Sequence, residues 1–148
     1  MRVVVQRSLK ATMKVDGKKF SEIPHGLMLL VGFTEGDSIE EIKWMVNKII
    51  NLRIFDDENG VMNKSVLDVE GEILSVSQFT LYADCKKGNR PSYIKALGGE
   101  KASPLYDLFN EELSKHITVK TGVFGADMQI DFTNNGPVTI ILEKENAK

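Results

Sequence analysis

The stretch from Gly26 to Phe33, which reads Gly-Leu-Met-Leu-Leu-Val-Gly-Phe, constrains the fold more than any other part of the chain. A strand points successive side chains to opposite faces, and this stretch is apolar on both of them. Such a strand has to be covered on each side, so we expect it at the buried centre of a sheet. Residues 72–79 predict a second interior strand.

Turn residues and β-branched runs predict the other strands. Residues 2–22 open with three valines and contain Asp16-Gly17, a pair typical of tight hairpin turns, so we expect a small meander there. Closing strands are expected over residues 118–123, 128–132 and 138–142.

Two helices are predicted from capping residues that precede apolar residues at helical spacing. Ser38 and Glu41 form a capping box that opens the first helix, and Ser103-Pro104 suits the N-cap and first position of the second. The core-facing residues expected on these helices are Ile39, Ile42, Val46, Ile49, Ile50, Leu105, Leu108, Phe109 and Leu113. Strands and helices do not alternate as in a doubly wound sheet. We therefore expect an α+β fold, a mostly antiparallel β-barrel-like sheet with two main helices packed outside.

Composition sets the class of protein. With 148 residues, 42% of them hydrophobic and 27% charged, we expect one soluble domain over residues 1–148. A net charge of −2 argues against bulk electrostatic capture of nucleic acid, although a local basic face can still hold a few phosphates. No apolar run is long enough for a membrane span, and the single cysteine, Cys85, fits a reducing compartment. The expected location is the cytoplasm.

Several common kinds of chemistry have no motif in this chain. The two histidines, His25 and His116, lie in no metal-ligand spacing, and no glycine-rich phosphate loop is present. We expect no metal, no nucleotide cofactor and no other cofactor. His25 follows a proline at a turn and His116 ends the second predicted helix, so both are interpreted as structural.

The string Ser77-Gln78-Phe79-Thr80-Leu81 is the first functional signal. If Phe79 packs inward, alternation places Ser77 and Leu81 on its face and the other two on the opposite face. At a strand end this alternation breaks, and all four neighbours could line one pocket rim. Thr80 has no adjacent base that would make it a strong nucleophile. The alternative is a core strand whose hydroxyls bond to neighbouring backbone.

The string from Asn134 to Thr139 is the second signal. Asn135-Gly136 alone would make a hairpin turn, yet Pro137 removes a backbone donor where the next strand should begin. Gly-Pro is also the pair most easily held in unusual backbone geometry, including a cis peptide. A local departure of this kind is often a functional site. The alternative is a hairpin corner with proline on an edge strand.

A third string, Lys87 to Tyr93, lies in a loop-like region over residues 83–101 that is rich in lysine and arginine. Basic residues beside an aromatic residue could hold phosphates and stack a base. A solvated loop is the other interpretation.

Together these strings resemble the D-aminoacyl-tRNA deacylase family, formerly called D-tyrosyl-tRNA deacylase. The opening Met1 to Arg7 matches the usual start of the family, and Ser77–Leu81 and Asn134–Thr139 match its two signature motifs. Lys87–Tyr93 resembles its Gly-x-Arg-Pro-Ser-aromatic segment. The similarity runs from end to end of the chain.

The resemblance implies an activity and partners. Family members are homodimers with β-barrel-like subunits, and each active site forms at the subunit interface. They bind the 3′-terminal aminoacyl-adenosine of aminoacyl-tRNA. They hydrolyse the ester that joins a D-amino acid, or glycine on the wrong tRNA, to the terminal ribose.

The resemblance also implies roles for residues. Catalysis would involve Ser77, Gln78, Phe79 and Thr80, and substrate binding would involve Arg7, Asn134, Gly136, Pro137, Val138 and Thr139. Gly136-Pro137 would be cis and inserted into the partner's pocket, so that an L side chain clashes with its backbone. Arg7 would fix the orientation of this loop.

Two mechanisms and two rival functions remain open at this stage. Thr80 could attack as the nucleophile, or the terminal 2′-hydroxyl of the tRNA could drive cleavage while backbone N–H groups around Phe79 and Thr80 stabilise the oxyanion. The second mechanism is preferred. One rival function is a non-catalytic RNA-binding module that uses the basic residues over 86–101. The other is an esterase or amidase that acts on small D-configured compounds without RNA.

Overall fold

The computed structural model describes all of residues 1–148. Its elements along the chain are β1 Arg2–Val15, β2 Lys18–Ile23, β3 Gly26–Gly32, α1 Ile39–Asn51, β4 Phe55–Asp56, β5 Met62–Lys64, β6 Glu72–Ser77, the 3₁₀ turn η1 Phe79–Tyr82, α2 Gly99–Ser114, β7 Val119–Thr121 and β8 Met128–Glu143. The main sheet has the order β2-β1-β3-β6-β7, with β8 on the other edge of β1, and β4-β5 forms a separate ribbon. Neither helix is long and apolar enough to cross a membrane.

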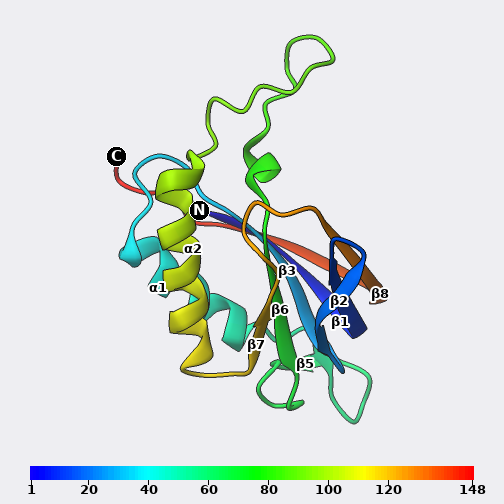
Figure 1. Ribbon diagram of the computed structural model, residues 1–148. Helices are drawn as coiled ribbons and strands as arrows, with labels where there is room; N and C mark the ends of the chain where they lie inside the picture. The colour runs from blue at the N-terminus through cyan, green and yellow to red at the C-terminus, as the bar shows by residue number, and fades with distance from the viewer.

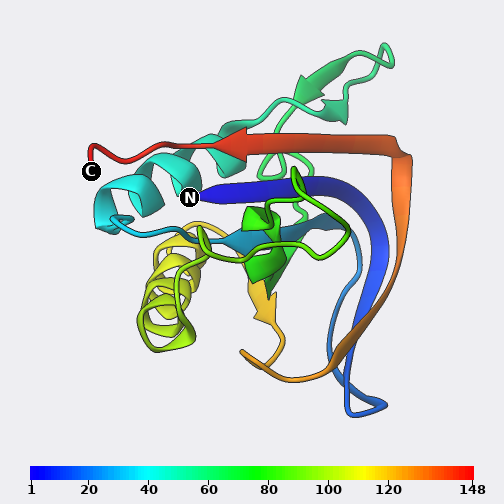
Figure 2. The same cartoon turned by 90° about the horizontal axis from the view of Figure 1, so that it is seen from above.

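Strand β1 organises the sheet because its two halves have different partners. Arg2–Ser8 pairs with β3, Ala11–Val15 pairs with β2, and β8 follows the other edge along both halves. Figure 2 shows β1 and β8 bending together through a corner, which curls the sheet into a nearly closed barrel. The predicted α+β fold is therefore confirmed. The pairs β3–β6 and β6–β7 are parallel. The connection between the two strands contains a helix in both cases, α1 in the first and α2 in the second, as parallel pairing usually requires.

The apolar strand predicted from residues 26–33 lies between β1 and β6, as expected. Its alternate side chains serve two separate cores. Leu27, Leu29 and Val31 enter the larger cluster, which the two helices cover on one side of the sheet (Figure 1). Met28 enters a smaller cluster with Met13 and other residues. The absence of a polar face on this strand is explained by its burial between these two clusters.

The first helix follows its prediction. The Ser38 side chain accepts from the helix backbone and the Glu41 side chain accepts from the Ser38 backbone, so the capping box is confirmed. Ile42, Val46, Ile49 and Ile50 are buried, and Ile39 packs partly buried against the same cluster.

The second helix begins a turn earlier than predicted. Its N-cap is Gly98 rather than Ser103, and Pro104 lies inside the helix. The reason is tertiary: Leu97 and Ala102 are buried in the larger core, and the amide of Ala102 already bonds to the Gly98 carbonyl. The helix ends at Ser114, so His116 lies just beyond it.

The predicted hairpin at Asn135-Gly136 is wrong. Strand β8 continues through this point, and both of its halves pair with β1 instead of with each other. Gln6 is opposite Thr139 and Ser8 is opposite Asn134, so the residues between them loop out of the ladder opposite Arg7. The Asn-Gly signal marks a bulge because β1 is long enough to serve as the partner on both sides of it.

Candidate active site

The string Ser77 to Leu81 departs from the prediction that Phe79 continues the strand. Strand β6 ends at Ser77, and the chain turns into η1 with the Phe79 side chain 56% exposed. The turn closes over Gly32 at the end of β3, where an added Cβ would lie 3.0 Å from the Gln78 carbonyl oxygen and 3.2 Å from the Leu81 Cβ. The bare backbone of Gly32 therefore gives the chain room to fold over β3, and alternation stops.

A cavity of about 640 Å³ lies at this end of β3 and β6. Ser77, Gln78 and Phe79 line it, which agrees with the expected pocket rim, whereas Thr80 does not. The apolar part of the lining includes Phe33, Val76, Tyr93, Leu97, Ala102, Phe124, Met128 and Ile130. Polar groups at one rim of an apolar cavity are typical of a small-molecule site.

Thr80 has a hydrogen-bond partner but no base. The side-chain amide of Gln78 donates to Thr80 Oγ1, and an amide cannot take up a proton. Both histidines lie near the start of β6. Glu72 N donates to the His25 carbonyl, and Ile73 N donates to the carbonyl of Thr118, two residues after His116. That end of β6 is about 17 Å from Ser77 at the usual rise per residue. A Ser–His or Thr–His pair is therefore absent from this pocket.

A metal site usually needs several ligating side chains close together, next to the pocket or elsewhere in the fold. The structure has no group of three His, Cys, Asp or Glu side chains that could hold a metal ion. Asp127 is the one charged residue in the pocket lining, and it is exposed.

The Gly136-Pro137 loop is braced from beneath by Arg7. The peptide bond between Gly136 and Pro137 is cis. Arg7 is only 8% exposed, and its guanidinium donates to the carbonyl oxygens of Asn135 and Ile54, each at 2.9 Å. Gly136 has a φ of +129°, and an added Cβ would lie 2.8 Å from the Arg7 guanidinium. This close approach, together with the positive φ, requires glycine.

Asn134 and Val138 hold the two ends of the same loop. Asn134 Oδ1 accepts from the Val138 amide at 3.0 Å, and Asn134 Nδ2 donates to Thr139 Oγ1 at 2.9 Å. Val138 packs against the larger core, while Gly136 and Pro137 remain exposed. The predicted substrate-binding residues thus gather in one place, and their tip points to solvent.

The chain does not bring this loop to its own pocket. The loop lies opposite Arg7, which is in register with Leu27 on β3 and through it with Ile73 on β6. Ser77 is four residues further along β6, and β1 and β3 lie between the two strings. At ordinary strand spacing they are about 20 Å apart along the sheet.

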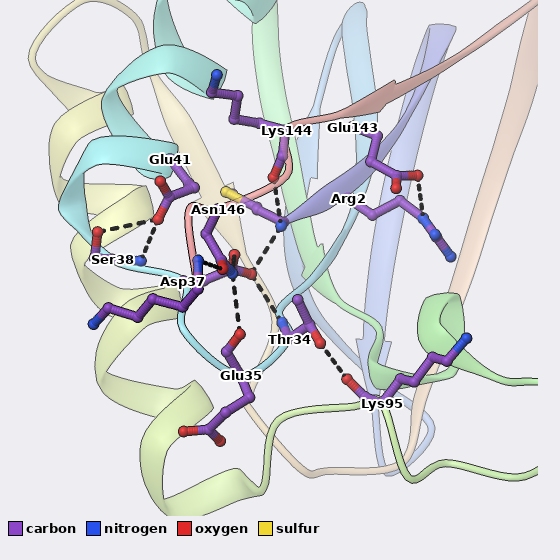
Figure 3. A network of polar contacts seen from close by, with 12 residues as sticks. Arg2, Thr34, Glu35, Asp37, Ser38, Glu41, Lys95, Glu143, Lys144 and Asn146 are labelled. Carbon is purple, nitrogen blue, oxygen red and sulfur yellow. Dashed lines mark hydrogen bonds and ion pairs between the residues drawn. The ribbon is translucent and has the colours of Figure 1, made fainter.

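A polar network joins the Met1 amino group, the Thr34 amide and the Asn146 side chain to the Asp37 carboxylate (Figure 3). The Arg2 guanidinium lies 4.5 Å from the centre of the Tyr82 ring, donates to the Leu81 carbonyl and pairs with Glu143, so it ties the end of η1 to β1 and β8. Burial raises the pKa of Tyr82, so its hydroxyl stays protonated. On the other side of the network, the Thr34 hydroxyl donates to the Lys95 carbonyl.

Similarity to known proteins identifies the family of this chain. A family model described as D-Tyr-tRNA(Tyr) deacylase matches residues 4–143. The chain belongs to this family. The resemblance drawn from the motifs is thereby confirmed. A protein named D-aminoacyl-tRNA deacylase from Bacteroides fragilis (strain YCH46) is 57% identical over the full length of both chains, and one from Clostridium acetobutylicum is 51% identical over 99% of each.

Two solved structures share the fold of the family. The structure named c-Myc DNA Unwinding Element Binding Protein has a TM-score of 0.93 and 44% identity, with 98% of this chain and 99% of that chain covered. A probable eukaryotic D-amino acid tRNA deacylase has a TM-score of 0.82 at 20% identity, over 95% of this chain and 97% of that chain, which shows the fold alone.

Sequence reasoning missed most of the apolar pocket wall. Leu97, Ala102, Phe124 and Met128 come from separate segments with no shared motif. The one local signal was Phe124-Gly125, an aromatic residue and a glycine directly after a predicted strand.

Proposed function

We propose that this protein hydrolyses the ester bond of D-aminoacyl-tRNA and releases free amino acid and tRNA. Membership of the family and the names of relatives at 51–57% identity support this function. The observation that carries the proposal is the separation between residues 77–81 and residues 134–139 within one chain. One chain has a pocket with a polar rim at Ser77 and Gln78, and an exposed, braced Gly136-Pro137 loop that it cannot insert there itself.

A homodimer would complete the site, because each chain would present its loop to the pocket of the other. The Arg7 and Asn134 hydrogen bonds support this assignment, since they hold the loop in one shape while leaving its tip exposed. A tip that is already rigid loses little further entropy when it inserts.

The same rigidity suits a chiral filter. In the dimer, the loop backbone would approach the substrate Cα from the side on which an L side chain projects. An L-aminoacyl group would clash, a D side chain would point away, and glycine would pass because it has no side chain. Rejection by a clash needs a surface that cannot move aside, which the Arg7 support provides.

The pocket would receive the 3′-terminal aminoacyl-adenosine. Its volume of about 640 Å³ lies within the range typical of small-molecule sites. Its largely apolar lining suits a base, and Phe79 and Tyr93 offer aromatic surfaces at the rim, with ring centres 5.1 Å apart.

Catalysis would depend on the substrate and on backbone amides. The first hydrogen bond of η1 runs from Leu81 N to the Gln78 carbonyl, and no side chain caps the turn. The preceding amides of Phe79 and Thr80 could therefore stabilise an oxyanion on the ester carbonyl. With no base beside Thr80, we assign activation of the attacking water to the neighbouring 2′-hydroxyl of the tRNA.

A rival function is nucleic-acid binding without hydrolysis. The basic segment before α2, and the name of the 44% identical solved structure, favour this candidate. Hydrolysis of D-Tyr-tRNA and L-Tyr-tRNA, followed side by side with catalytic amounts of protein, separates the two. We expect release from the D-substrate with the L-substrate intact. Binding without release from either substrate would favour the rival.

A further inference from the structure

Residues 84–95, here called the basic loop, project away from the body of the molecule between η1 and α2 (Figure 1). Two backbone hydrogen bonds of 2.8 Å between Asp84 and Ser92 close this loop. The residues beyond that bridge are all exposed, and Gly88 at the tip has no neighbour within 4 Å of an added Cβ. The tip therefore makes little contact with the rest of the chain.

The base of the basic loop is fixed to the wall of the pocket. Tyr93 lines the pocket and packs edge-on against Phe79. The Lys95 carbonyl accepts from Thr34, and two residues later the Leu97 amide donates to the Phe33 carbonyl at 3.0 Å. The direction in which the loop leaves the pocket is therefore set by the fold.

The tip of the basic loop carries unpaired positive charge. Lys86, Lys87 and Arg90 form no ion pair, and their side chains make no hydrogen bond. The one acid in the loop, Asp84, is already engaged by Lys95 at 3.8 Å and by the Lys86 amide at 3.0 Å. Three free cations within five residues stand out on a chain whose net charge is −2.

We propose that the basic loop binds the phosphate backbone of the tRNA acceptor end while the terminal adenosine occupies the pocket. This inference rests on the proposed function, which places a tRNA 3′ end in the pocket. Gly88 at the tip is four residues from the bridge at Asp84, so the loop extends at most about 13 Å beyond the bridge and carries the three cations along this length. The nucleotides that precede the terminal adenosine have to lie outside the pocket, and their phosphates are spaced at regular intervals along the chain that leads away from it.

Phosphates match the chemistry of the tip better than bases do. Lys86 and Lys87 offer donors and charge but no stacking surface, and Arg90 adds a fork of donors that matches the geometry of a phosphate. The only aromatic residue of the loop, Tyr93, already belongs to the pocket. Contacts with phosphates position a nucleic acid without reading its sequence. The loop should therefore contribute to binding of any tRNA and leave the chemical step unchanged.

The test compares two triple variants with the wild-type protein. The first combines Lys86→Ala, Lys87→Ala and Arg90→Ala. The matched control combines Lys18→Ala, Lys43→Ala and Lys120→Ala, which removes the same charge from three exposed lysines on other elements. Hydrolysis of D-Tyr-tRNA is followed between about 50 mM and about 200 mM salt, the range over which phosphate contacts are lost.

We expect the loop variant to raise KM at least about tenfold at low salt, with kcat within about twofold of wild type. The salt dependence of log KM should become shallower by about two units, because each lost phosphate contact removes about 0.7. The control variant should match the wild-type protein in both respects.

Other outcomes separate the two proposals. Equal KM values and salt slopes for the two triple variants would overturn the phosphate role and leave the proposed function standing. A fall in kcat with KM unchanged would also overturn it. If wild-type protein releases nothing from D-Tyr-tRNA, the proposed function fails. Titration of labelled uncharged tRNA then decides the loop: weaker binding by the loop variant alone supports its role, and equal binding by all three proteins overturns it.

Discussion

Residues 134–139 and residues 79–95 both reach the surface, but the fold holds them in different ways. Arg7, which is buried, and Asn134 fix the backbone of the first segment along its length. The second segment is attached mainly at its two ends, through the Arg2 contact with Leu81 and the Thr34 contact with Lys95. The first segment is built to keep one shape, whereas the second is built to reach outward.

This difference explains how the two segments divide the work in the proposed reaction. A filter that rejects one hand of a substrate by clash fails if it can yield, so it needs support from buried groups. A loop that follows a flexible nucleic-acid backbone needs charge and reach. Substitutions in or beneath the first segment should therefore cost stability, and substitutions in the second should cost little.

The largest effect is expected from Arg7→Ala. This change leaves the Asn135 and Ile54 carbonyls without their charged donor and opens space beneath the loop. We expect the free energy of unfolding to fall by about 3 kcal/mol, measured by urea denaturation, together with a loss of discrimination between D- and L-Tyr-tRNA. Arg7→Lys keeps the charge but not the planar fork, so it should recover only part of both. Wild-type stability in Arg7→Ala would show that the loop does not depend on this support.

A matched pair of glycine substitutions tests the comparison directly. At Gly136 an added Cβ meets Arg7 at 2.8 Å and Val138 at 2.9 Å, and the φ of +129° is outside the usual range for alanine. Gly136→Ala should cost about 2 kcal/mol of stability. At Gly88, in the basic loop, φ is +65° and the space is open, so Gly88→Ala should cost only about 1 kcal/mol.

Thermal and urea unfolding of the two variants give the difference. Equal losses, or a larger loss at Gly88, would contradict the view that the first segment is the tightly packed one. Activity on D-Tyr-tRNA should also fall at Gly136 and remain close to wild type at Gly88.

The same contrast explains which parts of the fold the sequence could predict. The capping box of Ser38 and the apolar strand from Gly26 were correct because their signals are local or depend only on burial. The hairpin at Asn135-Gly136 was wrong because β1 continues as a shared partner, which no local pattern reveals. The start of α2 was wrong because burial of Leu97 and Ala102 outweighs a good N-cap at Ser103.

The site was predictable to a similar extent. Arg7 and Gly136-Pro137 were singled out through the family motifs, and the structure shows a hydrogen bond from Arg7 to the carbonyl of Asn135, the residue before Gly136. The prediction that Phe79 continues the strand was wrong because the chain turns over Gly32, a contact between β3 and η1 that no local sequence pattern reveals. The apolar wall of the pocket depends on how distant segments meet.

A smaller effect is expected from Arg2→Lys, which tests the anchor of the second segment. Lysine keeps the charge near Glu143 but loses the planar contact over the Tyr82 ring and the bond to the Leu81 carbonyl. We expect the free energy of unfolding, measured by urea denaturation, to fall by about 1 kcal/mol. Glu143→Gln is the control, because it removes only a partly exposed ion pair and should cost less than about 0.5 kcal/mol. A larger loss in the control would mean that the ion pair, not the stacking contact, holds η1.

The smallest effect is expected from Thr80→Ala. The Thr80 hydroxyl is exposed and bonded only to the Gln78 amide, so the variant should be as stable as wild type. Alanine keeps the backbone amide assigned to the oxyanion, and activity on D-Tyr-tRNA should remain within about fivefold of wild type. Phe79→Pro removes the other amide assigned to the oxyanion at the first position of the turn, where proline is tolerated because Gln78 before it is extended, and should lower kcat by about 10²–10³-fold. If alanine instead abolished hydrolysis, the hydroxyl itself would be the nucleophile, and the role given to the 2′-hydroxyl of the tRNA would be lost.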